Sequence, residues 1–466
     1  MQSVDGRLSQ SLNPATGKAI GEFCDAGNAD ALMAIEAAHN ARKNTDWAHK
    51  PRLREQVLLE FASLVQSELP NLARLLSEEN GKLLVEAEGE LHASVSELKY
   101  YAGLSRNIFG RTIELEPGLF SSLHREPLGV AGIIVPWNAP IILLIRSLAP
   151  ALAAGCTTVV KIAPQTALVS NRVFELLSQV EQLPSGVVNA FTETGSEGAQ
   201  ALVSSMDVDV ISYTGSTEVG KRIMAAGANT LKRMNLELGG SAPCIVFEDA
   251  DIEYAAAALV KAGMFMAGQY CCSATRLLVQ RGVLQEMQNH LASLLSSLKL
   301  GPGLDPASQM GPLIDAAEQA RVMKLLKDAN KTDEILCDCS PVEGGEGFFL
   351  TPGLIYAPDK KSVFYREEVF GPLLVIDGFD DEDEAIAKAN DTRYGLAASV
   401  WSSDLRKSQR VANALESGTV WINSHGRTFP EIENGGYKES GIGRLHGVEG
   451  LSEFLQTKHI SYSTSG

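Results

Sequence analysis

"GVAGIIVPWNAPIILLIRSLAPALAAGCTTVVKI", residues 129–162, predicts a strand, a helix and a second strand. Residues 129–136 are a short apolar run typical of a buried strand, residues 141–154 have helical length, and residues 156–162 are β-branched and apolar. Three further apolar segments continue the alternation: VVNAF (187–191), VDVISYTG (208–215) and MNLEL (234–238). The sequence therefore predicts a parallel sheet with helices on both faces, and a second α/β region over about 240–440.

The flanking sequence has other patterns. Residues 29–43 and 51–69 predict amphipathic helices. IFGRTIEL (108–115) and LFSSLHREPLG (119–129) predict two strands of a projecting hairpin around a Glu-Pro-Gly turn. The tail QTKHISYST (456–464) predicts a single strand, which needs a partner in the hairpin or in another subunit.

Composition excludes several classes of protein. The chain of 466 residues carries a net charge of −17, which argues against nucleic acid and against anionic membranes as partners. The N-terminus lacks the apolar region of a secretory signal, and no apolar run is long enough to span a membrane. Seven scattered cysteines indicate a reducing compartment, so we expect a cytoplasmic protein. No metal site is expected.

Four stretches carry residues that could do chemistry. TGSTEVG (214–220) could be a phosphate loop or an ordinary turn before a helix. Asn138 follows a strand and could stabilise an oxyanion or merely begin the next helix. Glu237 could be a general base or a paired carboxylate. In GQYCC (268–272) a cysteine could be a nucleophile or an inert core side chain.

Seven motifs taken in order resemble the signatures of the aldehyde dehydrogenase superfamily: PWNAP, VVKIAPQT, TGSTEVG, LELGG, GQYCC, EEVFGP and ENGGYKESGIGR. NPATG near the start is similar to that family's opening, so the resemblance runs from about residue 13 to about residue 458. It implies an α/β fold with three parts. These are a Rossmann-like cofactor domain (1–105 and 129–239), a catalytic α/β domain (240–440), and a β-hairpin oligomerisation arm with the tail (106–128 and 441–466).

The resemblance also implies catalytic roles. Cys271, the second residue after Gln269, matches the nucleophile that forms a thiohemiacetal and then a thioester with an aldehyde. Asn138 and the backbone N–H of Cys271 match the oxyanion site, and Glu237 matches the base that activates water. A glutamate at that position favours hydrolysis over transfer to coenzyme A.

For the cofactor, the resemblance implies NAD, with NADP left open. Lys161 matches a lysine that meets the adenine ribose, and Glu368 and Phe370 match the contacts of the nicotinamide ribose and ring. Pro164 occupies the place of a glutamate that often binds the ribose 2′-hydroxyl, so discrimination against a 2′-phosphate is missing. The remaining cofactor positions implied are Trp137, Gly215, Ser216, Gly220 and Leu238.

The sequence departs from the family at three positions where many members carry a charged residue. Ser241, Leu445 and Ser147 stand where many members have Lys, an acid and Lys, so a proton relay behind Glu237 must be built differently. The substrate pocket implied by the resemblance comprises Ala139, Ile142, Arg146, Tyr270, Cys272, Thr428 and Asn434. It is less apolar than average, and a large ring at Tyr270 should narrow it.

Arg146 leaves the substrate open. Succinate-semialdehyde dehydrogenases resemble this stretch in having Arg there to meet a carboxylate, but their usual second Arg is Phe265 here. Relatives that act on aromatic aldehydes share PWNAP followed by Arg. A structural ion pair is the third interpretation of Arg146, and a buried Arg disfavours a trimethylammonium aldehyde such as betaine aldehyde.

Two further expectations follow from the resemblance. The hairpin and tail imply a homodimer or homotetramer. A non-catalytic structural or binding member of the family is the alternative to an enzyme, and the joint retention of Cys271, Glu237 and Asn138 argues against it.

Overall fold

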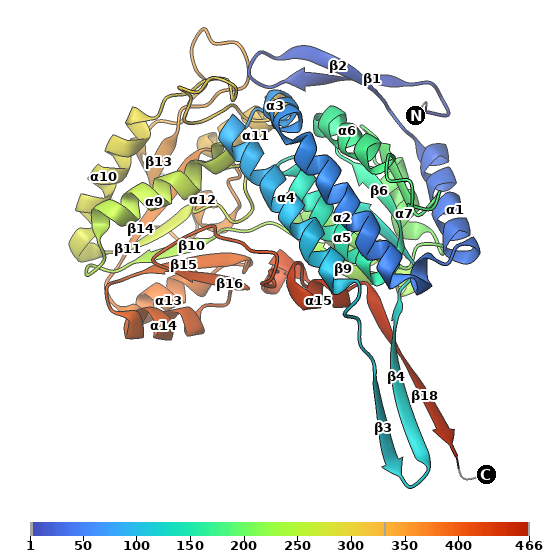
Figure 1. The fold of residues 1–466 in the computed structure, drawn as a ribbon. Coiled ribbons are helices and arrows are strands. Elements are labelled where there is room, and N and C mark those ends of the chain that lie inside the picture. The colour runs from blue at the N-terminus through green and yellow to red at the C-terminus, as the bar shows by residue number, and fades with distance from the viewer. Residues whose placement is uncertain (1–2, 330–331, 465–466) are drawn as a thin grey trace.

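The structure is a computed structural model that describes residues 3–329 and 332–464. Within those residues the strands form four sheets, of two, seven, six and three strands. The two large sheets lie side by side in the body of the molecule, each with helices around it, and the three-stranded sheet projects away from the body (Figure 1).

The six-stranded sheet, here the first sheet, has the order β17-β9-β8-β5-β6-β7. Its strands are β5 (Val130–Ile134), β6 (Thr157–Ile162), β7 (Val188–Thr192), β8 (Val210–Thr214), β9 (Arg233–Glu237) and β17 (Gly441–Ile442). All pairs are parallel except β17 with β9. The chain runs outward from β5 to β7 and then returns to β8 on the other side of β5. Loops after β5 and β8 therefore meet at the reversal of strand order, where α/β sheets bind ligands.

Helices cover both faces of the first sheet because its strands are apolar on both sides. Val130, Ile134 and Val159 join one buried cluster, whereas Ile133 and Val160 join the other. One face carries α1 (Asn28–Asn44), α7 (Glu197–Ser204) and α8 (Thr217–Gly227). The other carries α2 (Pro51–Ser67), α3 (Leu69–Asn80), α4 (Leu84–Leu104), α5 (Pro140–Ala154) and α6 (Ala167–Leu177). The predicted alternation of strands and helices is confirmed.

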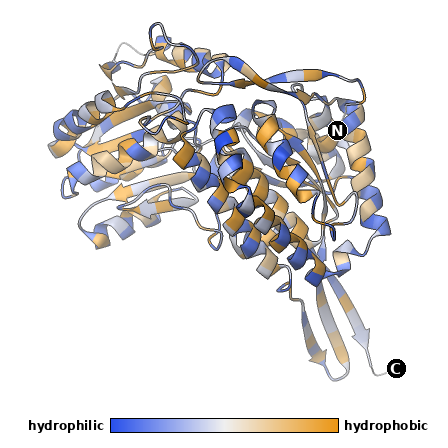
Figure 2. Cartoon of the chain, turned by 45° about the horizontal axis from the view of Figure 1, so that its top comes forward, coloured by the Kyte–Doolittle hydropathy of each residue, from blue (hydrophilic) through white to orange (hydrophobic). Residues whose placement is uncertain are grey.

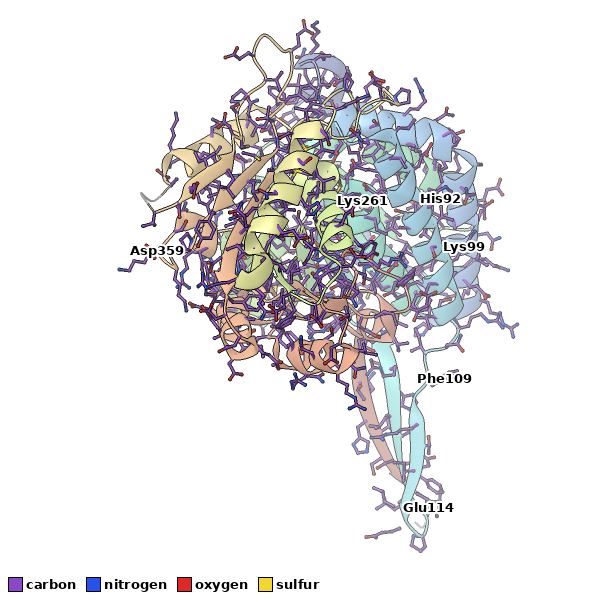
Figure 3. The ribbon with its side chains drawn as sticks, turned by 90° about the vertical axis from the view of Figure 1, so that its left-hand side faces the viewer. His92, Lys99, Phe109, Glu114, Lys261 and Asp359 are labelled. Carbon is purple, nitrogen blue, oxygen red and sulfur yellow. The ribbon has the colours of Figure 1, made fainter. Side chains whose placement is uncertain are left out.

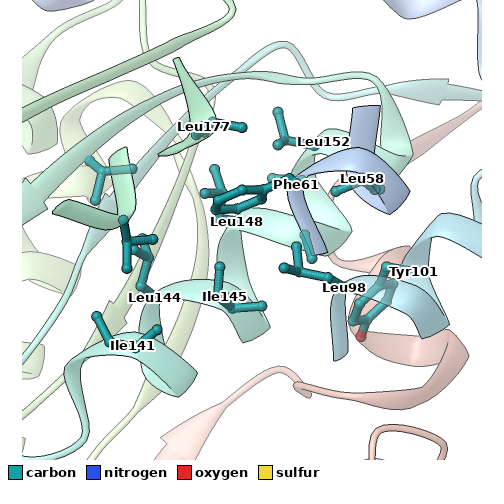
Figure 4. Close-up of a cluster of buried hydrophobic side chains, with 14 of the residues drawn as sticks. Leu58, Phe61, Leu98, Tyr101, Ile141, Leu144, Ile145, Leu148, Leu152 and Leu177 are labelled. Carbon is teal, nitrogen blue, oxygen red and sulfur yellow. The ribbon is translucent and has the colours of Figure 1, made fainter. Parts of the chain in front are cut away.

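The central helix of this face is α5. Pro140 fits its first turn, where a backbone N–H has no helical partner, and Gly155 ends it with φ of 98°. Apart from Ile142, all its residues are buried. Leu144, Leu148 and Leu152 gather with Phe61 of α2 in one apolar cluster (Figure 4). A helix buried all round holds its N-terminal loop, which includes Asn138, against a rigid core.

The seven-stranded sheet, here the second sheet, has the order β12-β13-β14-β11-β10-β15-β16 and is parallel except for β12 with β13. Its strands are β10 (Pro243–Val246), β11 (Arg276–Gln280), β12 (Glu334–Cys337), β13 (Gly353–Tyr356), β14 (Leu373–Phe379), β15 (Ala397–Trp401) and β16 (Thr419–Ile422). Its helices are α9 (Ile252–Met264), α10 (Leu284–Ser297), α11 (Ala316–Lys327), α12 (Val363–Arg366), α13 (Glu382–Asn390) and α14 (Leu405–Ala414). The predicted second α/β region is confirmed.

Two smaller sheets complete the molecule. β1 (Leu8–Asn13) and β2 (Lys18–Cys24) form an antiparallel hairpin. β3 (Arg111–Glu116), β4 (Leu119–Pro127) and β18 (Leu455–Ser463) form the projecting sheet, here called the arm, in the order β18-β4-β3. The predicted tail strand thus finds its partner in the predicted hairpin, pairing Leu455 with Pro127 and Ser463 with Leu119.

The remaining helices are short: α15 (Gly447–Ser452), and the 3₁₀ helices η1 (Trp47–His49), η2 (Pro164–Thr166), η3 (Ala228–Thr230), η4 (Phe265–Gly268), η5 (Arg281–Val283) and η6 (Lys438–Ser440). The domain limits expected from the sequence stay a prediction, and β17, which falls in the expected tail range, pairs with the first sheet. Across the described residues, no helix has the length and apolar content needed to cross a membrane.

Candidate active site

The turn before Cys271 is built from unusual backbone conformations. After α9 the chain passes through Met266, Ala267 and Gly268 with φ of 51°, 54° and 75°. A Cβ on Gly268 would lie 2.0 Å from the carbonyl oxygen of Gly371, so this position requires glycine. Gln269 holds the turn, since its Nε2 donates to the Met266 carbonyl at 3.0 Å and its Oε1 accepts from Ile314 N at 2.9 Å. This packing explains the Gly-Gln pair ahead of the cysteines.

The two adjacent cysteines have different surroundings. Cys271 is half-buried, whereas Cys272 is 1% exposed and belongs to an apolar cluster with Ala242, Leu396 and Ala397. Their sulfur atoms lie 4.0 Å apart. The hydrogen bond with Cys271, together with burial, raises the pKa of the Cys272 thiol well above its usual range. Since the thiolate is the nucleophilic form, Cys272 is the poorer candidate and Cys271 the better one.

Buried charges hold the loop that carries Asn138. Its side-chain amide donates to the carbonyl of Gln269 at 3.0 Å, and one further amide hydrogen remains for another acceptor. Its own carbonyl accepts from Lys82 Nζ at 2.8 Å. Lys82 also pairs with Glu90 of α4, which in turn accepts from Ile141 N at 2.7 Å. The positions of Asn138 and Cys271 are therefore coupled through Gln269.

Glu237 ends β9 and meets Arg146 of α5. Glu237 Oε2 lies 3.2 Å from Arg146 Nη1, and the two side chains are only 2% and 5% exposed. The angles at this contact are not those of a hydrogen bond, so the attraction is mainly between charges. Arg146 Nη2 donates to Thr214 Oγ1 at 3.1 Å. This contact agrees with the third interpretation of Arg146, a structural ion pair with a carboxylate of the protein itself.

One cavity collects the predicted catalytic and substrate residues. All ten line it: Asn138, Ala139, Ile142, Arg146, Glu237, Tyr270, Cys271, Cys272, Thr428 and Asn434. They come from α5, the end of β9, the turn after η4 and the loop that follows β16. Side chains from both large sheets thus meet in a single cavity.

The predicted cofactor residues lie near the reversal of strand order. Ser216 begins α8, where its Oγ accepts from Val219 N at 3.4 Å. A Cβ on Gly220 would lie 2.5 Å from a methyl group of Leu238, so this close packing of α8 on the strand end depends on glycine. The ring of Trp137, after β5, packs edge-on against Phe370 with centroids 5.7 Å apart. The free N–H groups at the start of α8 suit a phosphate.

Glu368 is a half-buried carboxylate beside these residues. Its Oε1 accepts from Gly240 N at 3.1 Å, and a Cβ on Gly239 would lie 2.5 Å from its Oε2. Desolvation raises the pKa of Glu368 to about 7, against the opposing effect of the Gly240 hydrogen bond. Desolvation likewise lowers the pKa of the half-buried Lys161 amine. The N–H groups at the start of α8, two aromatic rings and a half-buried carboxylate fit a dinucleotide.

Several residues of the site were missed from the sequence. Lys82 and Glu90 position the Asn138 loop, and Glu97 and His446 line the cavity as a buried pair. Lys82, Glu90 and Glu97 lie at or near α4, where the spacing of apolar residues indicates only an amphipathic helix. The family resemblance singled out Leu445 because it replaces an acidic residue, but it gave no reason to single out the neighbouring His446.

Comparisons with known proteins agree with this geometry. The model of the aldehyde dehydrogenase family matches residues 2–460. The chain belongs to the aldehyde dehydrogenase family. The expected fold and the expectation of an oxidoreductase of this family are confirmed.

The similar aldehyde dehydrogenases span nearly the whole chain. Betaine aldehyde dehydrogenase of Bacillus subtilis is 38% identical over 97% of this chain and 94% of its own length. A probable succinate-semialdehyde dehydrogenase [NADP(+)] of Sinorhizobium fredii is 38% identical over 96% and 91%. The crystal structure of betaine aldehyde dehydrogenase from Staphylococcus aureus in complex with NAD+ has 36% identity and a TM-score of 0.98, covering 100% of this chain and 94% of that one.

Proposed function

We propose that the protein oxidises an aldehyde to the carboxylic acid with hydride transfer to NAD(P)+. The observation that carries the proposal is the meeting of Cys271, Asn138 and Glu237 in one cavity. A nucleophile, an amide donor and a carboxylate are the three groups that a covalent, hydrolytic route requires.

The steps follow from these side chains. The Cys271 thiolate attacks the aldehyde carbon and forms a thiohemiacetal, whose oxyanion accepts from the remaining Asn138 amide hydrogen and the backbone N–H of Cys271. Loss of a hydride from the thiohemiacetal carbon, which NAD(P)+ would accept when bound, leaves a thioester on Cys271. Glu237 then takes a proton from water, which attacks the thioester and releases the acid and the Cys271 thiolate.

The cofactor residues proposed are those around the start of α8. The N–H groups near Ser216 would hold the pyrophosphate, Lys161 the adenine ribose, and Glu368 the nicotinamide ribose. The similar Staphylococcus aureus enzyme is described in complex with NAD+ and the similar Sinorhizobium fredii enzyme is named for NADP+. NAD is our first choice because it is the more frequent cofactor in the family. NADP is the second, because Pro164 stands in place of a carboxylate that would repel a 2′-phosphate.

The substrate we propose is a polar or aromatic aldehyde. Two relatives that are equally identical to this chain are named for a cationic aldehyde and for an anionic one. Sequence identity alone therefore does not decide the charge of the substrate. Tyr270 and Phe429 offer rings to the cavity, the charge of Arg146 has Glu237 as its partner, and Glu97 accepts a hydrogen bond from His446. A neutral polar substrate therefore needs no further compensating charge.

Replacing each adjacent cysteine tests the reaction. Wild type should form NADH from a panel of aromatic, aliphatic, ω-carboxylic and ω-amino aldehydes, and Cys271→Ser should lose at least about a thousandfold of that rate. Cys272→Ser keeps the proposed nucleophile and should still turn over. NADH formation by Cys271→Ser at the wild-type rate, or none by wild type with either cofactor, would refute the proposal.

A carboxylate-bearing aldehyde, as in succinate-semialdehyde dehydrogenases, is the second candidate. It rests on Arg146, but such a substrate would have to replace Glu237 as the partner of that guanidinium. In the same panel, we expect Arg146→Ala to slow acetaldehyde and succinic semialdehyde alike, because Glu237 loses its charged neighbour. A rise in KM confined to the acidic aldehyde would favour the second candidate.

The assembly and location that we propose follow from the arm and the cysteines. The exposed arm supports a homodimer or homotetramer. All seven cysteines are free thiols, which supports a cytoplasmic location.

A further inference from the structure

A second buried pair lies in the wall of the same cavity. His446 Nδ1 lies 2.9 and 3.0 Å from the two carboxylate oxygens of Glu97, and the side chains are 8% and 1% exposed. Both residues line the cavity that contains Cys271. Because a carboxylate oxygen accepts, Nδ1 carries the hydrogen and donates it to Glu97. The ring is thereby fixed in orientation and in tautomer.

The opposite ring nitrogen is left for another group. Nε2 of His446 makes no hydrogen bond to any residue within 3–329 or 332–464, and it is not sealed from solvent. In the neutral imidazole with its hydrogen on Nδ1, Nε2 presents a lone pair. In that form His446 offers the cavity a hydrogen-bond acceptor whose ring is oriented by Glu97 from behind.

The backbone at His446 is strained. Its φ is 61° and its ψ is 177°, a region that favours glycine. The following residue is a glycine, Gly447, with φ of 59°. A histidine costs free energy at this position that a glycine would not.

A donor lines the same cavity. Asn434 and Leu445 exchange two backbone hydrogen bonds of 2.8 Å, which places Asn434 opposite the residue before His446. The side-chain oxygen of Asn434 accepts from Thr419 Oγ1 at 3.1 Å. Its amide hydrogens make no hydrogen bond to the residues that the structure describes, and Asn434 lines the cavity. A hydroxyl is the small group that uses both an amide donor and an imidazole acceptor.

We propose that His446 and Asn434 form a subsite for a hydroxyl group carried by the aldehyde substrate. The hydroxyl donates to His446 Nε2 and accepts from the Asn434 amide. This inference rests on the proposed function and names the substrate class within it. A carboxylate would face the Nε2 lone pair, and an apolar group would leave both polar atoms without a partner.

Matched aldehydes test the subsite: benzaldehyde against 4-hydroxybenzaldehyde, and butanal against 4-hydroxybutanal. Wild type should have the higher kcat/KM for the hydroxylated member of at least one pair. His446→Gly removes the imidazole and relieves the backbone, and should lower that preference by about tenfold or more. Val448→Gly alters an exposed residue in the first turn of α15, two residues after His446, and should keep the preference.

Asn434→Ala removes the donor alone and provides a second variant should His446→Gly not fold. It should lower the same preference with less effect on the unsubstituted aldehyde. The subsite would be overturned if the variants lowered kcat/KM equally for both members of each pair, or if wild type showed no preference. In either case wild type would still oxidise benzaldehyde and butanal. Absence of NADH from every aldehyde would instead overturn the proposed function, on which the subsite rests.

Discussion

At the scale of single residues, Glu368 combines burial with a role that needs its charge. A carboxylate accepts two ribose hydroxyls only when ionised, and burial raises its pKa to about 7. The ionised fraction therefore grows as the pH rises from 6 to 8. Through its proposed contact with the ribose, Glu368 should couple cofactor affinity to pH in the physiological range.

We expect the dissociation constant for NAD+ to fall by about tenfold between pH 6 and pH 8, as for a single acid titrating near 7. Calorimetric titration of wild type and Glu368→Gln at several pH values measures it without turnover. The amide cannot titrate, so the variant should bind more weakly at pH 8 and show a flat profile. Parallel profiles for the two proteins would contradict the assignment.

The places of Cys271, Glu237 and Asn138 at turns or strand ends could be predicted, because the apolar pattern reveals the strands. Their catalytic roles came from the family resemblance and stay a prediction. The partners of Arg146 and His446 were not predictable, because Glu237 and Glu97 reach them through tertiary packing across distant segments. A lone sequence gives the charge of Arg146 but not whether protein or substrate neutralises it.

At the scale of elements, α4 supports the site from one side. Its outward residues, such as His92 and Lys99, point into solvent (Figure 3). Its inward face carries Glu90 and Glu97, one supporting the Asn138 loop and the other His446. Helices were predicted from the sequence over 29–43 and 51–69 but not over 84–104, where two buried carboxylates interrupt the apolar face of α4.

Lys82→Met should destabilise the protein by about 3–5 kcal/mol, because it leaves Glu90 buried without a counter-charge. The Asn138 carbonyl also loses a donor, so kcat should fall as well. Urea unfolding and steady-state kinetics measure the two effects.

Lys99→Met, on the exposed face of α4, is the matched control and should change stability by less than about 0.5 kcal/mol. Adding Glu90→Gln to Lys82→Met removes the unpaired charge and should restore part of the stability. Equal stability of the Lys82 and Lys99 variants would contradict the supporting role.

At the scale of the whole molecule, the arm has no core of its own. Its three strands project from the body with hydrophobic positions along them (Figure 2). Ile113, Leu115, Ile460 and Tyr462 are each more than 40% exposed. A three-stranded sheet with apolar residues in water is marginally stable unless another surface covers it. The arm therefore supports the association of copies of this chain.

Light scattering coupled to gel filtration should give a particle of at least twice the mass of one chain. Ile460→Lys places a charge on β18 and should shift the population toward a single chain, because burying an unpaired charge at the interface is costly. Leu32→Lys, at an exposed position of α1 in the body, should leave the mass unchanged. A stable, active single chain in the wild-type protein would show that the arm needs no partner. If instead Ile460→Lys dissociates the assembly, a second copy of the chain covers the exposed apolar residues of the arm, Ile460 of β18 among them.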